Sequence, residues 1–130
     1  MLSYQHIYHA GNLADVHKHS LLAWMLAYLT RKDKPLTYLE THSGRALYDL
    51  QDDAALKTGE AQQGIAKALS WFAADHPYAS VLAKIKAAHG AQAYPGSPLI
   101  AAQMLRATDQ IHLAELSGGQ ADPRHRIGDV

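Results

Sequence analysis

Histidine is the residue type that first suggests chemistry in this 130-residue sequence, which contains nine histidines. Five of them fall in the first third of the chain: His6, His9, His17, His19 and His42. The His6-x-x-His9 spacing, and Asp15 and His19 four residues apart on one helix face, could hold zinc or manganese together with His42. None of the longer metal-binding signatures is present, and neutral imidazoles also form hydrogen bonds with nucleotide bases. A metal site is therefore the less favoured of the two interpretations.

A second candidate site lies in the stretch Leu36–Gly44, where a short apolar run ends in an acid, a hydroxyl, an imidazole and a glycine. This pattern predicts a buried strand that feeds a ligand-binding loop, because open α/β sheets bind ligands beyond the carboxyl ends of their strands. Glu115 stands near the end of the next expected strand, where such folds hold ribose hydroxyls. The polar end of Leu36–Gly44 and the acid near the end of the next strand agree, which favours a ligand corner over the alternative of an ordinary core strand and loop.

Other polar residues allow both a functional and a purely structural interpretation. Tyr4 and His6 could stack on and hydrogen-bond to an unstacked base, or could simply be surface residues of an N-terminal arm. Lys18 and His19 could equally form a solvated helix face. Ser97, followed by Pro98, is expected to be a helix N-cap. Trp24 and Trp71 stand in apolar helical stretches and are expected in the core.

The composition narrows the classes of function. Lys plus Arg and Asp plus Glu number 12 each, so there is no overall positive field and any contact with RNA must be local. The absence of cysteine excludes disulfides, thiolate metal sites and a cysteine nucleophile. The polar N-terminal residues do not resemble a secretory signal, which favours a cytoplasmic protein without a membrane partner. The apolar segment Leu21–Leu29 is too short for a membrane span and predicts a buried helix.

The expected elements place these residues at the ends of helices and strands. Asn12 is a good N-cap, and Asp15 three residues later nearly completes a capping box. The predicted elements are a helix over Leu13–Thr30, a strand over Leu36–Glu40, a helix from Thr58 to Asp75, a helix over Tyr78–Ala88, a helix from Ser97 to Thr108 and a strand over Gln110–Leu116. The basic residues 31–34 and Pro35 should end the first helix.

This order of elements predicts an α/β protein with two parallel strands joined by helices. Two parallel strands do not close a fold, since a doubly wound sheet needs further strands to bury both faces. The sequence is therefore expected to be the front part of a larger domain. The tail, residues 117–130, lacks an apolar period and is expected to be disordered.

Several separate stretches closely resemble the RlmJ family, bacterial S-adenosylmethionine-dependent methyltransferases that modify N6 of an adenine in 23S ribosomal RNA. The matching stretches, in colinear order over about residues 1–116, are Met1–Tyr4 with His6, His9–Asn12 with Ala14–Val16, Lys18–His19, Lys32–Pro35, Thr41–His42, Thr58–Glu60, Tyr94–Ala101 and Glu115–Leu116. The resemblance implies a Rossmann-like fold with a helical insertion, here at about residues 51–93. It also implies an enzyme that is a monomer when complete and needs no metal.

The resemblance assigns roles to matching positions. His19, His42, Ser97 and Glu115 are implied to contact S-adenosylmethionine, with Glu115 on the ribose hydroxyls. Tyr4, His6 and Lys18 are implied to face the active site or the RNA. These roles would give the N-terminal arm a purpose.

Two departures from the family pattern bear on activity. The glycine-rich loop is Ser43-Gly44-Arg45-Ala46, where the common form is Ala-Gly-Ala-Gly. The family's Asp-Pro-Pro-Tyr motif, which accepts hydrogen bonds from the adenine amino group, is absent, and Asp122-Pro123-Arg124-His125 does not replace it. We therefore expect a truncated chain without a catalytic residue, inactive alone. The alternatives are a non-catalytic fragment that binds cofactor or RNA and, less favoured, a histidine-based metallohydrolase.

Overall fold

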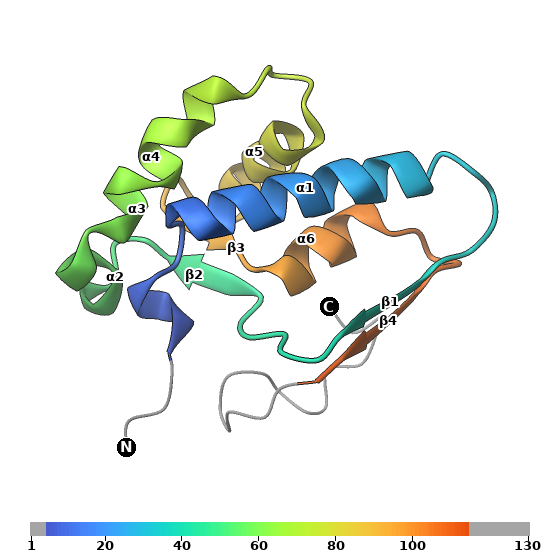
Figure 1. Cartoon of the computed structure of the whole chain (residues 1–130), viewed down its shortest axis with the longest axis horizontal. Coiled ribbons are helices and arrows are strands. Elements are labelled where there is room, and N and C mark those ends of the chain that lie inside the picture. The colour runs from blue at the N-terminus through green and yellow to red at the C-terminus, as the bar shows by residue number, and fades with distance from the viewer. Residues whose placement is uncertain (1–4, 115–130) are drawn as a thin grey trace.

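The helix α1 (Leu13–Leu29) runs through the middle of the molecule and packs against the helices α4, α5 and α6 (Figure 1). This computed structural model describes residues 5–114. The remaining elements are η1 (His6–Tyr8), β1 (Thr37–Glu40), β2 (Leu47–Asp49), α2 (Asp53–Thr58), α3 (Glu60–Gln63), α4 (Ile65–Ala68), η2 (Leu69–Trp71), α5 (Pro77–His89), β3 (Ala93–Pro95), α6 (Ser97–Met104) and β4 (Gln110–Leu113). No helix in this part of the chain is long and apolar enough to cross a membrane.

The start of α1 agrees with the sequence-based prediction. The side chain of Asn12 accepts a hydrogen bond from the backbone N–H of Asp15 at 2.9 Å, as an N-cap should. The carboxylate of Asp15 reaches back to the backbone N–H of Gly11 at 3.0 Å, one residue further than the reciprocal bond of a capping box. The predicted helix Leu13–Thr30 is confirmed to within one residue at its end.

The expectation that α1 is buried holds for only one of its faces. Val16, Ala23 and Leu26 are buried, whereas Trp24 is 53% exposed and its ring stacks on that of Tyr28. Trp71 is 67% exposed, so the placement of both tryptophans in the core was wrong. The segment is apolar on all sides, and such a helix carries no polar stripe from which the buried face could be predicted.

Strands β1 and β4 pair in parallel, as predicted, with Thr37 opposite Gln110 and Glu40 opposite Leu113. The prediction that the first strand is buried was wrong, because Leu39 is 66% exposed. Among the described residues this sheet has two strands only, which leaves much of its surface uncovered (Figure 1). The last two residues of the predicted second strand, Glu115 and Leu116, lie outside the described residues.

The loop between α1 and β1 is held by Arg106, which is more than seventy residues further along the sequence. The guanidinium of Arg106 donates hydrogen bonds to the carbonyls of Thr30 at 3.2 Å, Lys34 at 3.0 Å and Lys32. Hydrogen bonds from Arg106 also hold the pKa of Asp109 well below its usual range. The predicted helix from Ser97 to Thr108 ends earlier, at Met104, and this early end frees Arg106 for these contacts.

A second, antiparallel strand pair was missed. Strands β2 and β3 place Tyr48 opposite Tyr94, and neither strand is among the elements predicted from the sequence. Each strand has three residues, which is too short to show a hydrophobic period. The pair is nevertheless well buried, since Tyr48 and Tyr94 are 4% and 1% exposed.

The helix predicted from Thr58 to Asp75 is instead a series of short pieces, broken at Gly59 and Gly64. Gly59 has φ +67°, a left-handed conformation that ends α2. Gly64 lies directly against the N-terminal arm, where a Cβ atom would stand 2.2 Å from the carbonyl oxygen of Gly11. The next residue, Ile65, donates its backbone N–H to that same carbonyl at 2.8 Å. The break therefore comes from a tertiary contact that the helical pattern of the sequence does not reveal.

Replacing Gly64 with alanine should lower the free energy of unfolding by about 3 kcal/mol, because the new methyl group collides with backbone that cannot move aside. Gly59→Ala is the matched control: it has open space around its Cβ position and should cost about 1 kcal/mol for its positive φ. Urea unfolding followed by circular dichroism measures both. Equal losses would contradict the close approach at Gly64.

Candidate functional site

Polar side chains from three segments meet near the start of α1. They come from the N-terminal arm, from the first turns of α1 and from the carboxyl end of β1, where α6 also begins. The residues that form this candidate site are His6, Asp15, Lys18, His19, Glu40, Ser43 and Ser97.

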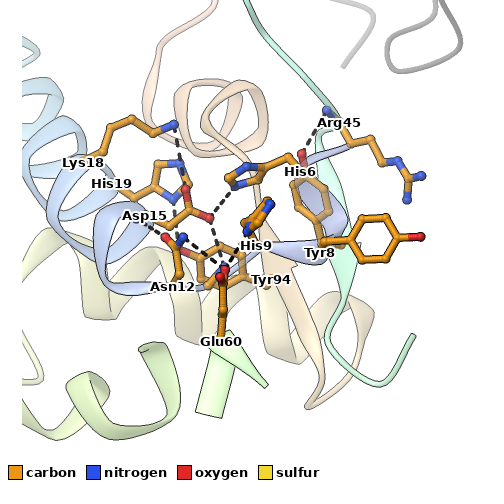
Figure 2. Close-up of polar contacts among 12 residues, drawn as sticks. His6, Tyr8, His9, Asn12, Asp15, Lys18, His19, Arg45, Glu60 and Tyr94 are labelled. Carbon is orange, nitrogen blue, oxygen red and sulfur yellow. Dashed lines mark hydrogen bonds and ion pairs between the residues drawn. The ribbon is translucent and has the colours of Figure 1, made fainter. Parts of the chain in front are cut away.

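Asp15 is the centre of the part of the site that includes the arm. Its side chain is buried, and its Oδ2 atom accepts a hydrogen bond from His6 Nε2 at 2.7 Å. Lys18 Nζ lies 3.9 Å from Oδ1. Figure 2 draws this ion pair as a dashed line. Burial alone would raise the pKa of Asp15, but the bond from His6, the charges of both histidines and the N–H of Gly11 together lower it. The carboxylate is therefore ionised at neutral pH.

His19 is a core histidine in this structure and is only 2% exposed. Its Nδ1 atom is 2.9 Å from the hydroxyl of Tyr94, which in turn is 2.9 Å from the hydroxyl of Tyr78 (Figure 2 shows His19 and Tyr94). Burial lowers the pKa of His19 to about 4, although the charge of Asp15 opposes this shift. The imidazole is thus neutral at pH 7. The solvated-face interpretation of His19 was wrong, whereas Lys18 is exposed.

The second part of the site is the corner where β1 ends. The hydroxyl of Ser97 donates a hydrogen bond to Glu40 Oε1. Ser97 is the first residue of α6, and Gly96 is the N-cap residue, so the prediction that Ser97 caps this helix was wrong. Burial raises the pKa of Glu40, while Ser97, Tyr38 and the charge of Lys18 act in the opposite direction.

Two buried oxygens of this corner are unsatisfied. Within the described part of the chain, Glu40 Oε2 and Ser43 Oγ have no hydrogen-bond partner. Buried polar atoms are nearly always paired, so these two unpaired oxygens near the end of β1 indicate places for hydrogen-bond donors of a ligand. Both residues were visible in the sequence as the polar end of the strand, but neither was selected as a site residue. Tyr78 and Tyr94 left no signal, since their contacts depend on the tertiary fold.

The structure brings some of the predicted site residues together. His6, Lys18, His19 and Ser97 belong to the candidate site. His42 is exposed on the loop after β1, and its Nδ1 atom is 2.9 Å from the hydroxyl of Thr41. The two remaining predicted residues, Tyr4 and Glu115, lie outside the described residues.

The histidines considered as metal ligands turn to different partners. His6 contacts Asp15, whereas His9 Nδ1 is 2.8 Å from Glu60 Oε2 (Figure 2). Across residues 5–114, no three side chains of His, Asp or Glu are arranged to hold a metal ion.

The chemistry of the corner fits S-adenosylmethionine. That cofactor carries ribose hydroxyls, an amino group and a positively charged sulfonium. A carboxylate and a serine hydroxyl can accept hydrogen bonds from the hydroxyls and the amino group, and a carboxylate can stabilise the positive charge. Glu40 and Ser43 supply two such acceptors, and both are buried next to a strand end. The residues present are therefore compatible with this cofactor.

Comparison with known proteins gives the family. Residues 33–123 match the family described as "Ribosomal RNA large subunit methyltransferase D, RlmJ". The chain is 43% identical over 121 residues to the "Ribosomal RNA large subunit methyltransferase J" of Escherichia coli, covering 89% of this chain and 42% of that protein. It is also 43% identical over 124 residues to the protein of the same name from Haemophilus influenzae, covering 89% and 43%.

A solved structure agrees with these relatives. A crystal structure of a Legionella pneumophila protein superimposes with a TM-score of 0.73 and 44% identity, covering 86% of this chain and 42% of that one. The fold is thus a mixed α/β structure that matches part of a larger protein, and the chain belongs to the RlmJ family of ribosomal RNA methyltransferases. It spans about two fifths of the length of these relatives.

The buried His19 should make stability depend on pH. Its pKa is about 4 in the folded chain and 6.5 when unfolded, so only the unfolded chain gains this proton as the pH falls between these values. The free energy of unfolding should therefore decrease by up to about 3 kcal/mol from pH 6.5 to pH 4. Urea unfolding at a series of pH values measures this.

The contribution of His19 is isolated by comparison with His19→Gln. Other groups also change the stability of the chain with pH. Protonation of Glu40, whose pKa is raised, stabilises the folded chain in the lower part of this range, and protonation of Asp15, whose pKa is lowered, destabilises it below pH 3.8. The useful quantity is therefore the difference in the free energy of unfolding between the wild type and His19→Gln. That difference should shrink as the pH falls. His17→Gln, which changes an exposed histidine on the same helix, is the control. A pH-independent difference for His19→Gln would contradict the buried neutral imidazole.

Proposed function

We propose that this chain forms the cofactor corner of a Rossmann-like, S-adenosylmethionine-dependent methyltransferase with a helical insertion, which acts on N6 of an adenine in 23S ribosomal RNA. The observation that carries the proposal is the pair of unsatisfied buried oxygens, Glu40 Oε2 and Ser43 Oγ, at the carboxyl end of a parallel strand. In open α/β sheets this is where nucleotide ligands bind. Membership of a ribosomal RNA methyltransferase family gives the class of reaction.

The residues of the corner would share the binding of the cofactor. Glu40, held by Ser97, offers one carboxylate oxygen to a donor, and Ser43 offers a hydroxyl. His19, His42 and Glu115 complete the proposed cofactor contacts, with Glu115 on the ribose. When bound, the cofactor supplies a methyl group on a sulfonium, which is activated for direct transfer to an amine.

The residues of the arm would face the RNA. A base whose amino group is methylated has to leave the stack of the RNA helix, and an aromatic ring with an imidazole can hold such a base. Tyr4 and His6 are proposed to hold the base. Lys18 has an exposed ammonium group and is proposed to contact a phosphate, or the substrate near Glu40. The contribution of these groups to the rate would be orientation of the amine without a covalent intermediate.

The 130 residues contain no Asp-Pro-Pro-Tyr motif. We therefore propose that these residues bind and orient, and that the group that accepts hydrogen bonds from the adenine amine is not among them. The alternative of a non-catalytic binding fragment shares this cofactor corner and differs only in the methyl transfer. Incubation with unmodified 23S ribosomal RNA and labelled cofactor tests the missing group, because transfer of label by these 130 residues would contradict both the proposed absence of that group and the non-catalytic alternative.

Calorimetry with S-adenosylmethionine tests the corner. Glu40→Gln keeps the size of the side chain but removes its charge, and His42→Ala removes the proposed contact on the loop. We expect each variant to bind the cofactor about tenfold more weakly, as the loss of one charged hydrogen bond implies.

The controls are matched in type. Asp75→Asn changes an exposed carboxylate before α5, and His17→Ala changes an exposed histidine on α1; both should leave the affinity unchanged. An unchanged affinity in both Glu40→Gln and His42→Ala would overturn the assignment of the cofactor to this corner.

A further inference from the structure

We propose that Asp15 is a positioning residue whose buried carboxylate fixes the orientation of the His6 imidazole and determines which of its ring nitrogens carries the proton. The inference rests on the proposed function for the part that concerns RNA, because His6 is there a substrate-facing group. Its structural part, the His6–Asp15 pair, does not depend on that function.

The position of the Asp15 carboxylate is itself tightly determined. The residue is 2% exposed and lies in the first turn of α1, where its backbone N–H is bound by Asn12. Its Oδ2 atom accepts hydrogen bonds from Gly11 N at 3.0 Å and from His6 Nε2 at 2.7 Å. A carboxylate held by the backbone on one side presents a fixed acceptor to the imidazole on the other.

The chemistry of this pair determines the state of the ring. An ionised carboxylate can only accept hydrogen bonds, so Nε2 of His6 must carry a hydrogen. In the neutral ring the lone pair is then on Nδ1, and a neighbouring carboxylate is a common way in which proteins select one tautomer of a histidine. The low pKa of Asp15 supports this, because the carboxylate stays ionised in its buried position.

The rest of the arm is held by the helical segment between β2 and β3. Glu60 Oε2 contacts His9 Nδ1 at 2.8 Å and Asn12 Nδ2 at 3.4 Å, and the hydroxyl of Thr58 donates to the carbonyl of Tyr8 at 2.5 Å. The backbone N–H of Ile65 donates to Gly11 O. These contacts fix the path of the chain on the C-terminal side of His6, and the ring of His6 itself donates a hydrogen bond to Asp15 (Figure 2).

The two carboxylates therefore allow a matched comparison. Asp15 and Glu60 each hold a histidine of the arm, and of these two carboxylates it is Asp15 that is hydrogen-bonded to His6. Asp15→Asn and Glu60→Gln make the same chemical change, from carboxylate to amide, with little change of shape. A general loosening of the arm would follow from both variants, whereas a change in the proton position of His6 should follow from Asp15→Asn alone.

The first measurement is the tautomer of His6, from the ¹⁵N chemical shifts of the labelled imidazole at a pH where the ring is neutral. We expect the proton on Nε2 in the wild type and in Glu60→Gln, and a mixture of tautomers in Asp15→Asn, whose side-chain amide can donate as well as accept. A proton on Nδ1 in the wild type, or unchanged shifts in Asp15→Asn, would overturn the proposal.

The second measurement is the binding of an unmodified 23S ribosomal RNA transcript by the wild type, Asp15→Asn, His6→Ala and the double variant. Asp15→Asn should weaken binding about fivefold, and the double variant should bind no more weakly than His6→Ala alone, because Asp15 acts through His6. Additive losses would show a merely structural role and overturn the proposal.

The two measurements separate the inference from the proposed function. If the wild type fails to bind the RNA, the substrate assignment fails, and the tautomer of His6 alone then decides the role of Asp15. If Asp15→Asn does not fold, the tautomer in the wild type and in Glu60→Gln still decides whether Nε2 carries the proton.

Discussion

The buried charge of Asp15 is the constraint on which the arrangement of the N-terminal third depends. A carboxylate without solvent must be surrounded by donors, since an unpaired buried charge costs several kcal/mol. In this chain the donors are the backbone of Gly11 and the ring of His6, with the ammonium of Lys18 close by. The contacts of this one charge thus hold the arm against α1 and bring an imidazole and an ammonium group together.

The arm in turn determines the shape of the helical segment that follows β2. Gly64 and Ile65 press against the carbonyl of Gly11, and this contact excludes a side chain at position 64. A continuous helix from residue 58 to residue 75 is incompatible with that approach, so the segment forms short turns instead. The break at Gly64 thus depends on a contact between residues more than fifty positions apart, whereas the break at Gly59 follows from its left-handed backbone.

The corner at the end of β1 is connected to the arm through Lys18, whose charge acts on both Asp15 and Glu40. The buried hydrogen-bonded group of His19, Tyr94 and Tyr78 ties α1 to β3 and α5. Two unsatisfied oxygens, Glu40 Oε2 and Ser43 Oγ, lie near the end of β1. Unpaired buried acceptors of this kind suit a ligand that supplies hydrogen-bond donors.

The sequence by itself determined the elements that depend on local signals. Asn12 as a cap, the apolar spacing of α1 and the parallel pairing of the strands at 37–40 and 110–113 follow from propensity and pattern, and the colinear motifs gave the family. Tertiary structure alone decided the features that require distant partners. These are the break at Gly64, the burial of His19, the β2–β3 pair and the bond from Ser97 to Glu40, for which the sequence had suggested a helix cap. A hydroxyl or an imidazole can satisfy itself locally or across the fold with similar energy, and only the packed chain determines which partner is within reach.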